Sequence, residues 1–384
     1  MKLSQLWAVV ILIMFSLVAF SASALAAEVP EISGEAFVLM DAASGNILAE
    51  SNSTQKWYPA STTKIMTLVL ALEGLADGSL SLEDTVVTSS YAASMGGSQV
   101  YLYDGETRSL HEMLIAVAVG SGNDASVAVA EHIAGSNEAF VEMMNQKAKE
   151  LGMKNTNFTN CHGLHDPNHY TTAADMAKLG LYAITVPKML DYTSIYEYDF
   201  RLDPKPLKLW STNRLLKWYD GVDGLKTGTT SEAKRNLVCT AERDSLRLIT
   251  VVMGVGEANG HFTQTMKLLN YGFNEYSFKS FYKANEMICS VPVNKGETDE
   301  VEAIAEKQVG VTIKKNNKAE ITTTLNFNTP LNAPITKGDI LGMVQVKEGE
   351  KVLAEVDLLA NADVAKISLI GQWREILVAT MSAV

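Results

Sequence analysis

Strand-like segments occur at both ends of a region that ends near residue 280, and the part between them has helical periodicity. Residues 34–50 contain two short apolar runs that flank Asp41-Ala-Ala-Ser-Gly-Asn46, a sequence typical of a hairpin turn. Residues 222–255 contain three further runs separated by polar turns. A sheet built from so few strands at each end buries its apolar faces only if the distant segments pair. The sequence therefore predicts one α/β domain whose sheet joins its N- and C-terminal segments.

The helical part of this region is marked by its boundary residues. Pro59 and small residues precede a long run of helix-forming residues that ends at Gly74, which predicts a mostly buried helix. Periodic apolar positions predict further helices in the ranges 109–133, 135–151, 172–185 and 260–272.

The chain changes character after residue 285. Short runs rich in β-branched residues alternate there with Lys, Glu, Asn and Gly, which predicts a small all-β domain over 285–365. A length of 384 residues fits two to three domains. A composition of 47% hydrophobic and 20% charged residues excludes a disordered chain and a multi-pass membrane protein.

The N-terminus has the pattern of a secretory signal. Lys2 is the only charged residue before Glu28, an apolar stretch covers 6–20, and small residues follow over 21–27. This order predicts a signal peptide over 1–26, cleaved after Ala24-Leu25-Ala26, and a mature protein that works outside the cytoplasm. The alternative is an uncleaved N-terminal anchor, since the uncharged stretch is just long enough to span a bilayer.

The net charge of the chain and the spacing of its cysteines and histidines argue against several functions. A net charge of −12 argues against nucleic-acid binding, which depends on clustered Lys and Arg. The three cysteines are too widely spaced for a zinc or redox motif. His162, His165 and His169 lie with Asp166 in one polar loop, but their spacing is unlike that of zinc ligands. We therefore expect no metal and no cofactor.

The pattern Ser-x-x-Lys is the first candidate for chemistry. A nucleophilic serine needs a base, and a lysine three residues further lies on the same helical face. The pattern occurs four times, starting at Ser53, Ser61, Ser231 and Ser280, and is uninformative alone. Only Ser61, with Lys64, opens a strongly apolar helix, where free backbone N–H groups favour a developing negative charge.

Two further motifs follow in the chain. Ser121-Gly-Asn123 lies between two helical runs, where it can direct a hydroxyl and an amide into a cleft. Lys226-Thr-Gly228 occurs once, in a strand-like segment. The glycine would let a substrate backbone lie close, and a lysine with the neighbouring hydroxyls of Thr227 and Thr229 suits a carboxylate.

The ordered set of Ser-x-x-Lys, Ser-x-Asn and Lys-Thr-Gly resembles the penicillin-recognising serine enzymes. The surroundings, including Pro59–Thr67, His169–Ala177 and Asp223–Thr229, resemble the low-molecular-mass D-alanyl-D-alanine carboxypeptidases. The resemblance covers about 34–275 and, more loosely, 285–365. Two departures concern substrate detail, namely Thr171 in place of a serine and a segment 256–261 without an arginine.

The resemblance implies a fold and a set of roles. The fold would be a DD-peptidase/β-lactamase-like α/β catalytic domain over 27–280, with an antiparallel sheet and a helical subdomain, followed by the all-β domain. Ser61 would be the acylated nucleophile, Lys64 its general base and Ser121 a proton relay to the leaving amine. The backbone N–H groups of Ser61 and Thr229 would form the oxyanion hole. The substrate-binding residues would be Asn123 for the substrate amide, and Lys226, Thr227, Gly228 and Thr229 for the terminal carboxylate.

The implied substrates are peptidoglycan peptide stems, with β-lactams as inhibitors. A transpeptidase of the same superfamily is the nearest alternative, because the two activities differ only in the acceptor of the acyl group. A β-lactamase would need a carboxylate for deacylation, as in a Glu-x-x-Leu-Asn segment, which is absent from the sequence. A non-catalytic cell-wall-binding protein is a further alternative, but it would have no physical reason to retain Ser61, Lys64, Ser121 and Lys226 together.

The C-terminal tail, 366–384, has an amphipathic pattern. Its apolar residues fall on one helical face, namely Leu369, Ile370, Trp373, Ile376 and Leu377. This face predicts peripheral contact with the outer face of the cytoplasmic membrane. A helix packed on the β-rich domain is the alternative, since Lys366 and Arg374 are the only basic residues available to anionic lipid.

Overall fold

The structure is a computed structural model that describes residues 28–203, 205–368 and 371. The chain divides by its contacts into 1–30 and 31–384. The predicted signal peptide and most of the C-terminal tail lie outside the described residues. Among those that are described, no helix is long and apolar enough to cross a membrane.

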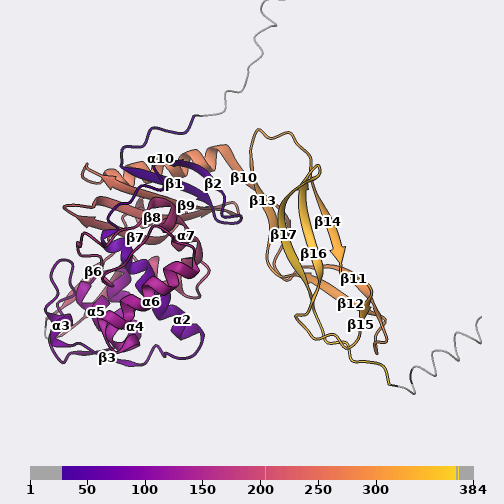
Figure 1. The fold of residues 1–384 in the computed structure, drawn as a ribbon, viewed down its shortest axis with the longest axis horizontal. Coiled ribbons are helices and arrows are strands. Elements are labelled where there is room, and N and C mark those ends of the chain that lie inside the picture. The colour runs from indigo at the N-terminus through magenta and orange to yellow at the C-terminus, as the bar shows by residue number, and fades with distance from the viewer. Residues whose placement is uncertain (1–27, 204, 369–370, 372–384) are drawn as a thin grey trace, which may run out of the picture. The chain divides into compact units, whose positions relative to one another are not determined.

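A five-stranded antiparallel sheet forms the centre of the first domain, with the strand order β2-β1-β9-β8-β7 (Figure 1). The prediction that the terminal segments pair is confirmed, because β1 lies directly beside β9. The strands are β1 (Ala36–Asp41), β2 (Ile47–Ser51), β7 (Val222–Thr230), β8 (Lys234–Arg243) and β9 (Leu246–Val255).

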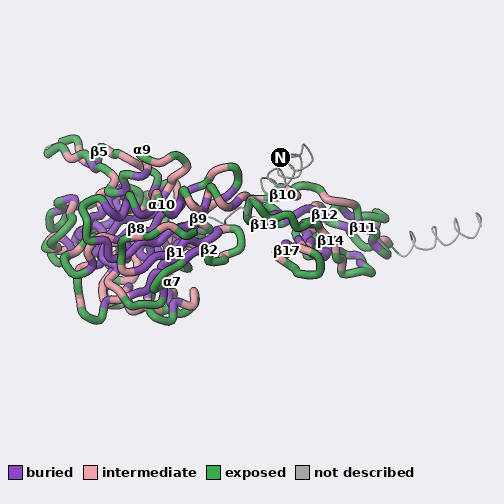
Figure 2. Tube along the Cα trace, turned by 90° about the horizontal axis from the view of Figure 1, so that it is seen from above, coloured by how far each residue is buried: buried purple, intermediate pink, exposed green. Residues whose placement is uncertain are grey.

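The sheet is covered on both faces, which explains why its strands are apolar throughout. All six residues of β1 are buried, and successive side chains alternate between the two faces. Val38 packs into the core beneath the helical subdomain, while Leu39 packs against the opposite side with α10 (Gly260–Glu275). Figure 2 shows the buried residues concentrated in β1, β8 and β9.

The helical subdomain contains the elements that carry the first two motifs. Its main helices are α2 (Lys64–Ala76), α4 (Leu110–Ala118), α5 (Asn123–Ala134), α6 (Asn137–Glu150) and α7 (Ala173–Ala183). The predicted range 109–133 is divided into α4 and α5 by a short break at Gly120–Gly122. Ser121 occupies the break in a left-handed conformation, with φ of 56°.

Short elements complete the first domain. They are η1 (Ala60–Thr63), β3 (Thr85–Val87), α3 (Ser90–Ala93), β4 (Thr107–Ser109), α8 (Met189–Thr193), β5 (Glu197–Arg201), β6 (Leu207–Trp210) and α9 (Leu215–Trp218). The pairs β3–β4 and β5–β6 each form a two-stranded antiparallel sheet.

The remaining described residues form the predicted all-β part, which has its own hydrophobic core. A six-stranded sheet has the order β14-β16-β17-β12-β11-β15, and β10 pairs with β13. Residues 276–280 of β10 fall inside the range predicted for the catalytic domain, but their backbone hydrogen-bonds to this part. The strands are β10 (Tyr276–Tyr282), β11 (Met287–Asn294), β12 (Glu300–Ala305), β13 (Val309–Lys314), β14 (Ile321–Phe327), β15 (Leu331–Asn332), β16 (Ile340–Glu348) and β17 (Lys351–Ala360).

Candidate active site

A single helical turn places Ser61 and Lys64 together. The turn η1 continues directly into α2, so residues three apart lie on one face. Lys64 Nζ is 3.1 Å from Ser61 Oγ. The N–H groups at the start of a helix have no helical acceptor, and within the described residues the Ser61 N–H donates to no protein group.

Lys64 is fully buried and has two further partners. Its Nζ donates to Asn123 Oδ1 at 2.7 Å and to the carbonyl oxygen of His162 at 2.7 Å. Burial lowers the pKa of Lys64 well below its ordinary value, and the nearby charge of Lys226 lowers this pKa further. Both effects favour the neutral amine, which can accept a proton.

The break between α4 and α5 brings Ser121 and Asn123 to the same place. Both side chains are buried. Asn123 Nδ2 donates to the carbonyl oxygen of Gly96 at 2.7 Å, which fixes the amide with its oxygen toward Lys64. Asp124 braces the adjoining loop, since its carboxylate accepts the backbone N–H groups of Val100 and Leu102.

Lys226, Thr227, Gly228 and Thr229 lie on β7, the edge strand of the sheet on this side. Lys226 is fully buried, and burial lowers the pKa of its ammonium group to about 7. Its Nζ lies 3.3 Å from Thr212 Oγ1, and Thr227 Oγ1 donates to the same hydroxyl at 2.6 Å. Thr229 is exposed.

Gly228 is required by the close approach of β7 to η1. A Cβ atom at this position would lie 2.7 Å from the carbonyl oxygen of Pro59 and 3.0 Å from the nitrogen of Ser61. A side chain at this position would therefore collide with the turn that carries Ser61. Asn236 of β8 strengthens the attachment, because its Nδ2 donates to the Pro59 carbonyl at 3.0 Å.

The motif residues border one cavity of about 540 Å³. Ser61, Ser121, Thr227, Gly228 and Thr229 line it, whereas the amine of Lys64 is buried behind Ser61. The cavity wall also contains residues that no motif identified, namely Tyr196, Trp210, Thr212, Arg214, Asn259 and His261. Arg214 contributes a guanidinium group to this wall, and its Nη1 donates to Asn259 Oδ1, within segment 256–261, at 3.5 Å. The only sequence signal near it is Ser211-Thr212-Asn213, one of two further Ser-x-Asn sequences in the chain, the other being Ser44-Gly-Asn46.

Two histidines of the polar loop, His162 and His169, are buried. Within the residues that the structure describes, no group of three or more His, Cys, Asp or Glu side chains could hold a metal ion. Burial lowers the pKa of His162 to about 3 and that of His169 to about 4, so both rings are neutral. Burial also raises the pKa of the Cys161 thiol to about 12, which leaves it unreactive.

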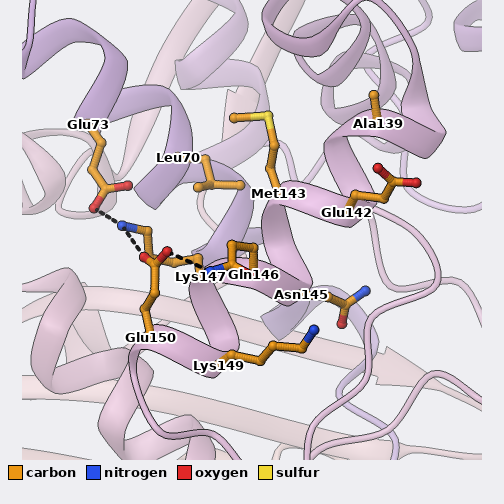
Figure 3. Close-up of a pocket in the computed structure, with 10 residues that line it drawn as sticks. All are labelled: Leu70, Glu73, Ala139, Glu142, Met143, Asn145, Gln146, Lys147, Lys149 and Glu150. Carbon is orange, nitrogen blue, oxygen red and sulfur yellow. Dashed lines mark hydrogen bonds and ion pairs between the residues drawn. The ribbon is translucent and has the colours of Figure 1, made fainter.

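A second cavity lies between α2 and α6 (Figure 3). Three of its charged residues pair with one another, since Lys147 Nζ contacts Glu73 at 2.8 Å and Glu150 at 3.3 Å. It contains no serine or cysteine beside a base. The cavity beside Ser61 is therefore the candidate active site.

Comparison with known proteins identifies the family. The D-alanyl-D-alanine carboxypeptidase family matches residues 23–257, and the C-terminal domain of penicillin-binding protein 5 matches residues 276–366. The chain is 40% identical over 346 residues to the D-alanyl-D-alanine carboxypeptidase DacF of Bacillus subtilis, covering 88% of this chain and 89% of the relative.

Solved structures agree with this assignment. Penicillin-binding protein 5 from Haemophilus influenzae is 35% identical, with a TM-score of 0.71 over 88% of this chain and all of that one. Penicillin-binding protein D2 from Listeria monocytogenes, solved in an ampicillin-bound form, is 32% identical and matches 64% of this chain with a TM-score of 0.58. The chain therefore belongs to the D-alanyl-D-alanine carboxypeptidases, the serine peptidases among the low-molecular-mass penicillin-binding proteins, as its motifs predicted.

Proposed function

We propose that the cavity beside Ser61 removes the terminal D-alanine from peptidoglycan pentapeptide stems through an acyl-enzyme on Ser61. The observation that carries this assignment is the environment of Lys64. A neutral amine has two protons and one lone pair. With the two protons donated to Asn123 Oδ1 and the His162 carbonyl, the lone pair is left for Ser61 Oγ at 3.1 Å.

In acylation, Ser61 Oγ attacks the carbonyl carbon of the D-Ala-D-Ala bond and its proton passes to Lys64 Nζ. The negative charge on the carbonyl oxygen is stabilised by the N–H groups of Ser61 and Thr229. As the C–N bond breaks, the proton moves from Lys64 through the Ser121 hydroxyl to the amine of the leaving D-alanine. The position of Ser121 in the cavity wall supports this relay.

Lys226, Thr227 and Thr229 bind the terminal carboxylate of the substrate. An arriving carboxylate favours the charged form of Lys226, so binding the substrate also places a cation beside Lys64 and keeps the pKa of Lys64 low. The Asn123 side chain orients the substrate amide. Penicillin, which carries a carboxylate next to a strained amide, enters the same site.

In deacylation, water attacks the ester carbonyl and gives a proton to Lys64. As the C–O bond to Ser61 breaks, Lys64 passes that proton to Ser61 Oγ, and the shortened peptide leaves with a new terminal carboxyl group. An amine acceptor in place of water would make the enzyme a transpeptidase. The extracytoplasmic location of peptidoglycan agrees with the predicted signal peptide, and we propose that the enzyme works at the outer face of the cytoplasmic membrane or in the cell wall.

Labelling with a fluorescent penicillin tests the assignment. We expect one covalent adduct, located on Ser61 by peptide mapping and lost in Ser61→Ala, together with release of free D-alanine from a D-Ala-D-Ala-terminated muropeptide. Ser53→Ala and Ser231→Ala serve as controls, because they remove serines of the same Ser-x-x-Lys pattern, and should label normally. An adduct on either of these serines refutes the assignment, and the absence of any adduct favours a non-catalytic protein. Dominant transfer to an added amine favours the transpeptidase.

A further inference from the structure

A chain of three hydrogen bonds leads from a loop backbone to the peptide bond before the nucleophile. The backbone N–H of Thr159 donates to Nδ1 of His169 at 2.9 Å. An N–H group can only donate, so Nδ1 is unprotonated and the neutral ring carries its proton on Nε2. Nε2 lies 2.8 Å from Thr63 Oγ1 and donates to it. The Thr63 hydroxyl donates in turn to the carbonyl oxygen of Ala60 at 2.8 Å.

The direction of this chain does not change near neutral pH. His169 is 1% exposed, and burial lowers the pKa of its ring to about 4. A proton on Nδ1 would point at the N–H of Thr159 and break that hydrogen bond. Burial also disfavours the doubly protonated, charged ring. The three bonds therefore have one arrangement in the folded protein.

The Ala60 carbonyl belongs to the same planar unit as the N–H of Ser61. In a trans peptide the C=O and the N–H point in opposite directions, so fixing one fixes the other. Ala60 has φ of 49°, a left-handed conformation that costs a residue other than glycine about 1 to 2 kcal/mol. This peptide therefore needs contacts that hold it in place.

The backbone of Gly163 also lies close to the carbonyl oxygen of Ala60. Gly163 has φ of 93°, and a Cβ atom there would lie 1.9 Å from the Ala60 carbonyl oxygen. Gly163 and His169 belong to one loop, so this loop contacts the peptide directly at Gly163 and indirectly through His169 and Thr63.

We propose that His169 and Thr63 are positioning residues that hold the Ala60–Ser61 peptide so that the Ser61 N–H points at the oxyanion. The inference rests on the proposed function, in which that N–H stabilises the negative charge of the tetrahedral intermediate. Neither side chain is among the residues that line the cavity, and each acts through the peptide that it fixes.

A valine at position 63 keeps the branched shape of threonine and removes the hydroxyl. Because an oxyanion donor acts mainly in the transition state, we expect Thr63→Val to lower kcat for D-alanine release about 10- to 100-fold, with KM within about twofold of wild type. A D-alanine-type peptide boronate, which forms a tetrahedral adduct on the serine, should lose affinity by a similar factor. Thr63→Ser restores the hydroxyl and should recover activity to within about threefold.

Thr62 provides a matched control on the same turn. It is also buried, and its hydroxyl donates to the Pro59 carbonyl at 2.8 Å, one peptide bond earlier. That carbonyl keeps Asn236 as a donor after substitution. Thr62→Val should therefore keep kcat within about threefold of wild type. An equal loss of kcat in the two valine variants, or wild-type kcat in Thr63→Val, overturns the inference.

A further variant, His169→Phe, covers the case in which Thr63→Val does not fold. His169→Phe keeps a ring in the same space, beside Phe158, and removes both nitrogens. It should lower kcat as Thr63→Val does, and the double variant should be no slower than the slower single one, because both residues act in one chain. Additive losses overturn the inference. Failure of wild type to acylate on Ser61 refutes the proposed function instead, so the two failures are distinguishable.

Discussion

Two lysines are buried beside the candidate active site, and their burial bears on both the proposed chemistry and the stability of the protein. Lys64 and Lys226 are each at most 1% exposed, and among the described residues neither forms an ion pair with a carboxylate. A buried cation without a counter-ion is unfavourable, so each group releases its proton more easily than it would in water. In the proposed mechanism this effect helps Lys64, which has to be neutral, and works against Lys226, which has to be charged.

The burial of Lys226 should cost stability. Its pKa is about 7 in the folded protein and about 10.4 in an unfolded chain. Between these values the unfolded chain binds more protons, so this group makes the protein more stable as pH rises from about 7 to about 10, and below about 7 the full penalty is present. We expect Lys226→Met to be inactive yet more stable by about 2 to 4 kcal/mol at pH 6.

Thermal melting at several pH values tests this prediction. The difference in melting temperature between Lys226→Met and wild type should be several degrees at pH 6 and should shrink toward pH 10. A variant that melts below wild type at pH 6 would show that the hydrogen bonds of Lys226 outweigh the cost of burying its charge.

The pKa of Lys226 should also determine how kcat/KM depends on pH in the alkaline range. A neutral Lys226 cannot pair with the substrate carboxylate, so kcat/KM for D-Ala-D-Ala substrates should fall as pH rises above about 7. Arginine does not titrate in this range, and Lys226→Arg should therefore lose the alkaline decline, even if its rate is lower.

Profiles of kcat/KM against pH, measured with a peptide and with its C-terminally amidated analogue, check the assignment. The amidated peptide should be a poor substrate whose profile lacks the decline. An alkaline decline that persists unchanged in Lys226→Arg would assign the pKa to another group.

At the level of elements, the site depends on how closely β7 approaches η1. The Cβ atom of an alanine at position 228 would lie within 3.0 Å of three backbone atoms of the turn, and neither backbone can move without displacing Ser61 or Lys226. We expect Gly228→Ala to lower the rate of penicillin acylation by at least about 100-fold, because small misplacements of reacting groups cost about this factor.

Gly256→Ala is the control for this substitution. A Cβ atom at position 256 would meet nothing within 4 Å, so the variant should acylate at close to the wild-type rate. Acylation of Gly228→Ala within about threefold of wild type, measured by stopped-flow with a reporter β-lactam, would show that β7 tolerates the displacement.

The sequence predicted those elements whose periodicity is long and regular. The strands within 222–255 and the helix that begins at residue 260 were clear because apolar residues recur along them at the spacing of a strand or a helix. The hairpin of β5 and β6 was missed, because a segment such as Glu197–Arg201 is short, charged and half exposed. Contacts distant in sequence support it, including the ion pair of Arg201 with Glu106 at 3.1 Å.

The residues of the candidate site also divide into those that the sequence predicts and those that it does not. Ser61, Ser121 and Lys226 belong to motifs whose spacing is visible in the chain, so they could be predicted. Thr212 and Arg214 follow the hairpin and reach the cavity only because the chain folds back there. His169 was noted for its polar loop, but its partner Thr63 is 106 positions away, and no local pattern encodes such a distance.

For the whole molecule, two observations support the proposal that the chemistry resides in the first domain. The β-rich part has a hydrophobic core of its own, and D2 from Listeria monocytogenes aligns over its full length with only 64% of this chain. We therefore propose the division at about residue 280 as one between a catalytic domain and a domain with another task, such as holding the enzyme at a surface.

The C-terminal tail is the candidate for surface attachment, and most of it lies outside the described residues. The predicted apolar face, which includes Trp373, should partition into the lipid interface, and with so few basic residues the binding should be driven by apolar contact. We expect the mature chain to co-sediment with anionic vesicles, to remain bound in high salt, and to lose binding when 366–384 are removed. Trp373→Ser should weaken binding in the full-length chain without changing acylation. Unchanged binding of the truncated chain, or aggregation and early melting of it, would make the tail a structural helix packed on the β-rich domain.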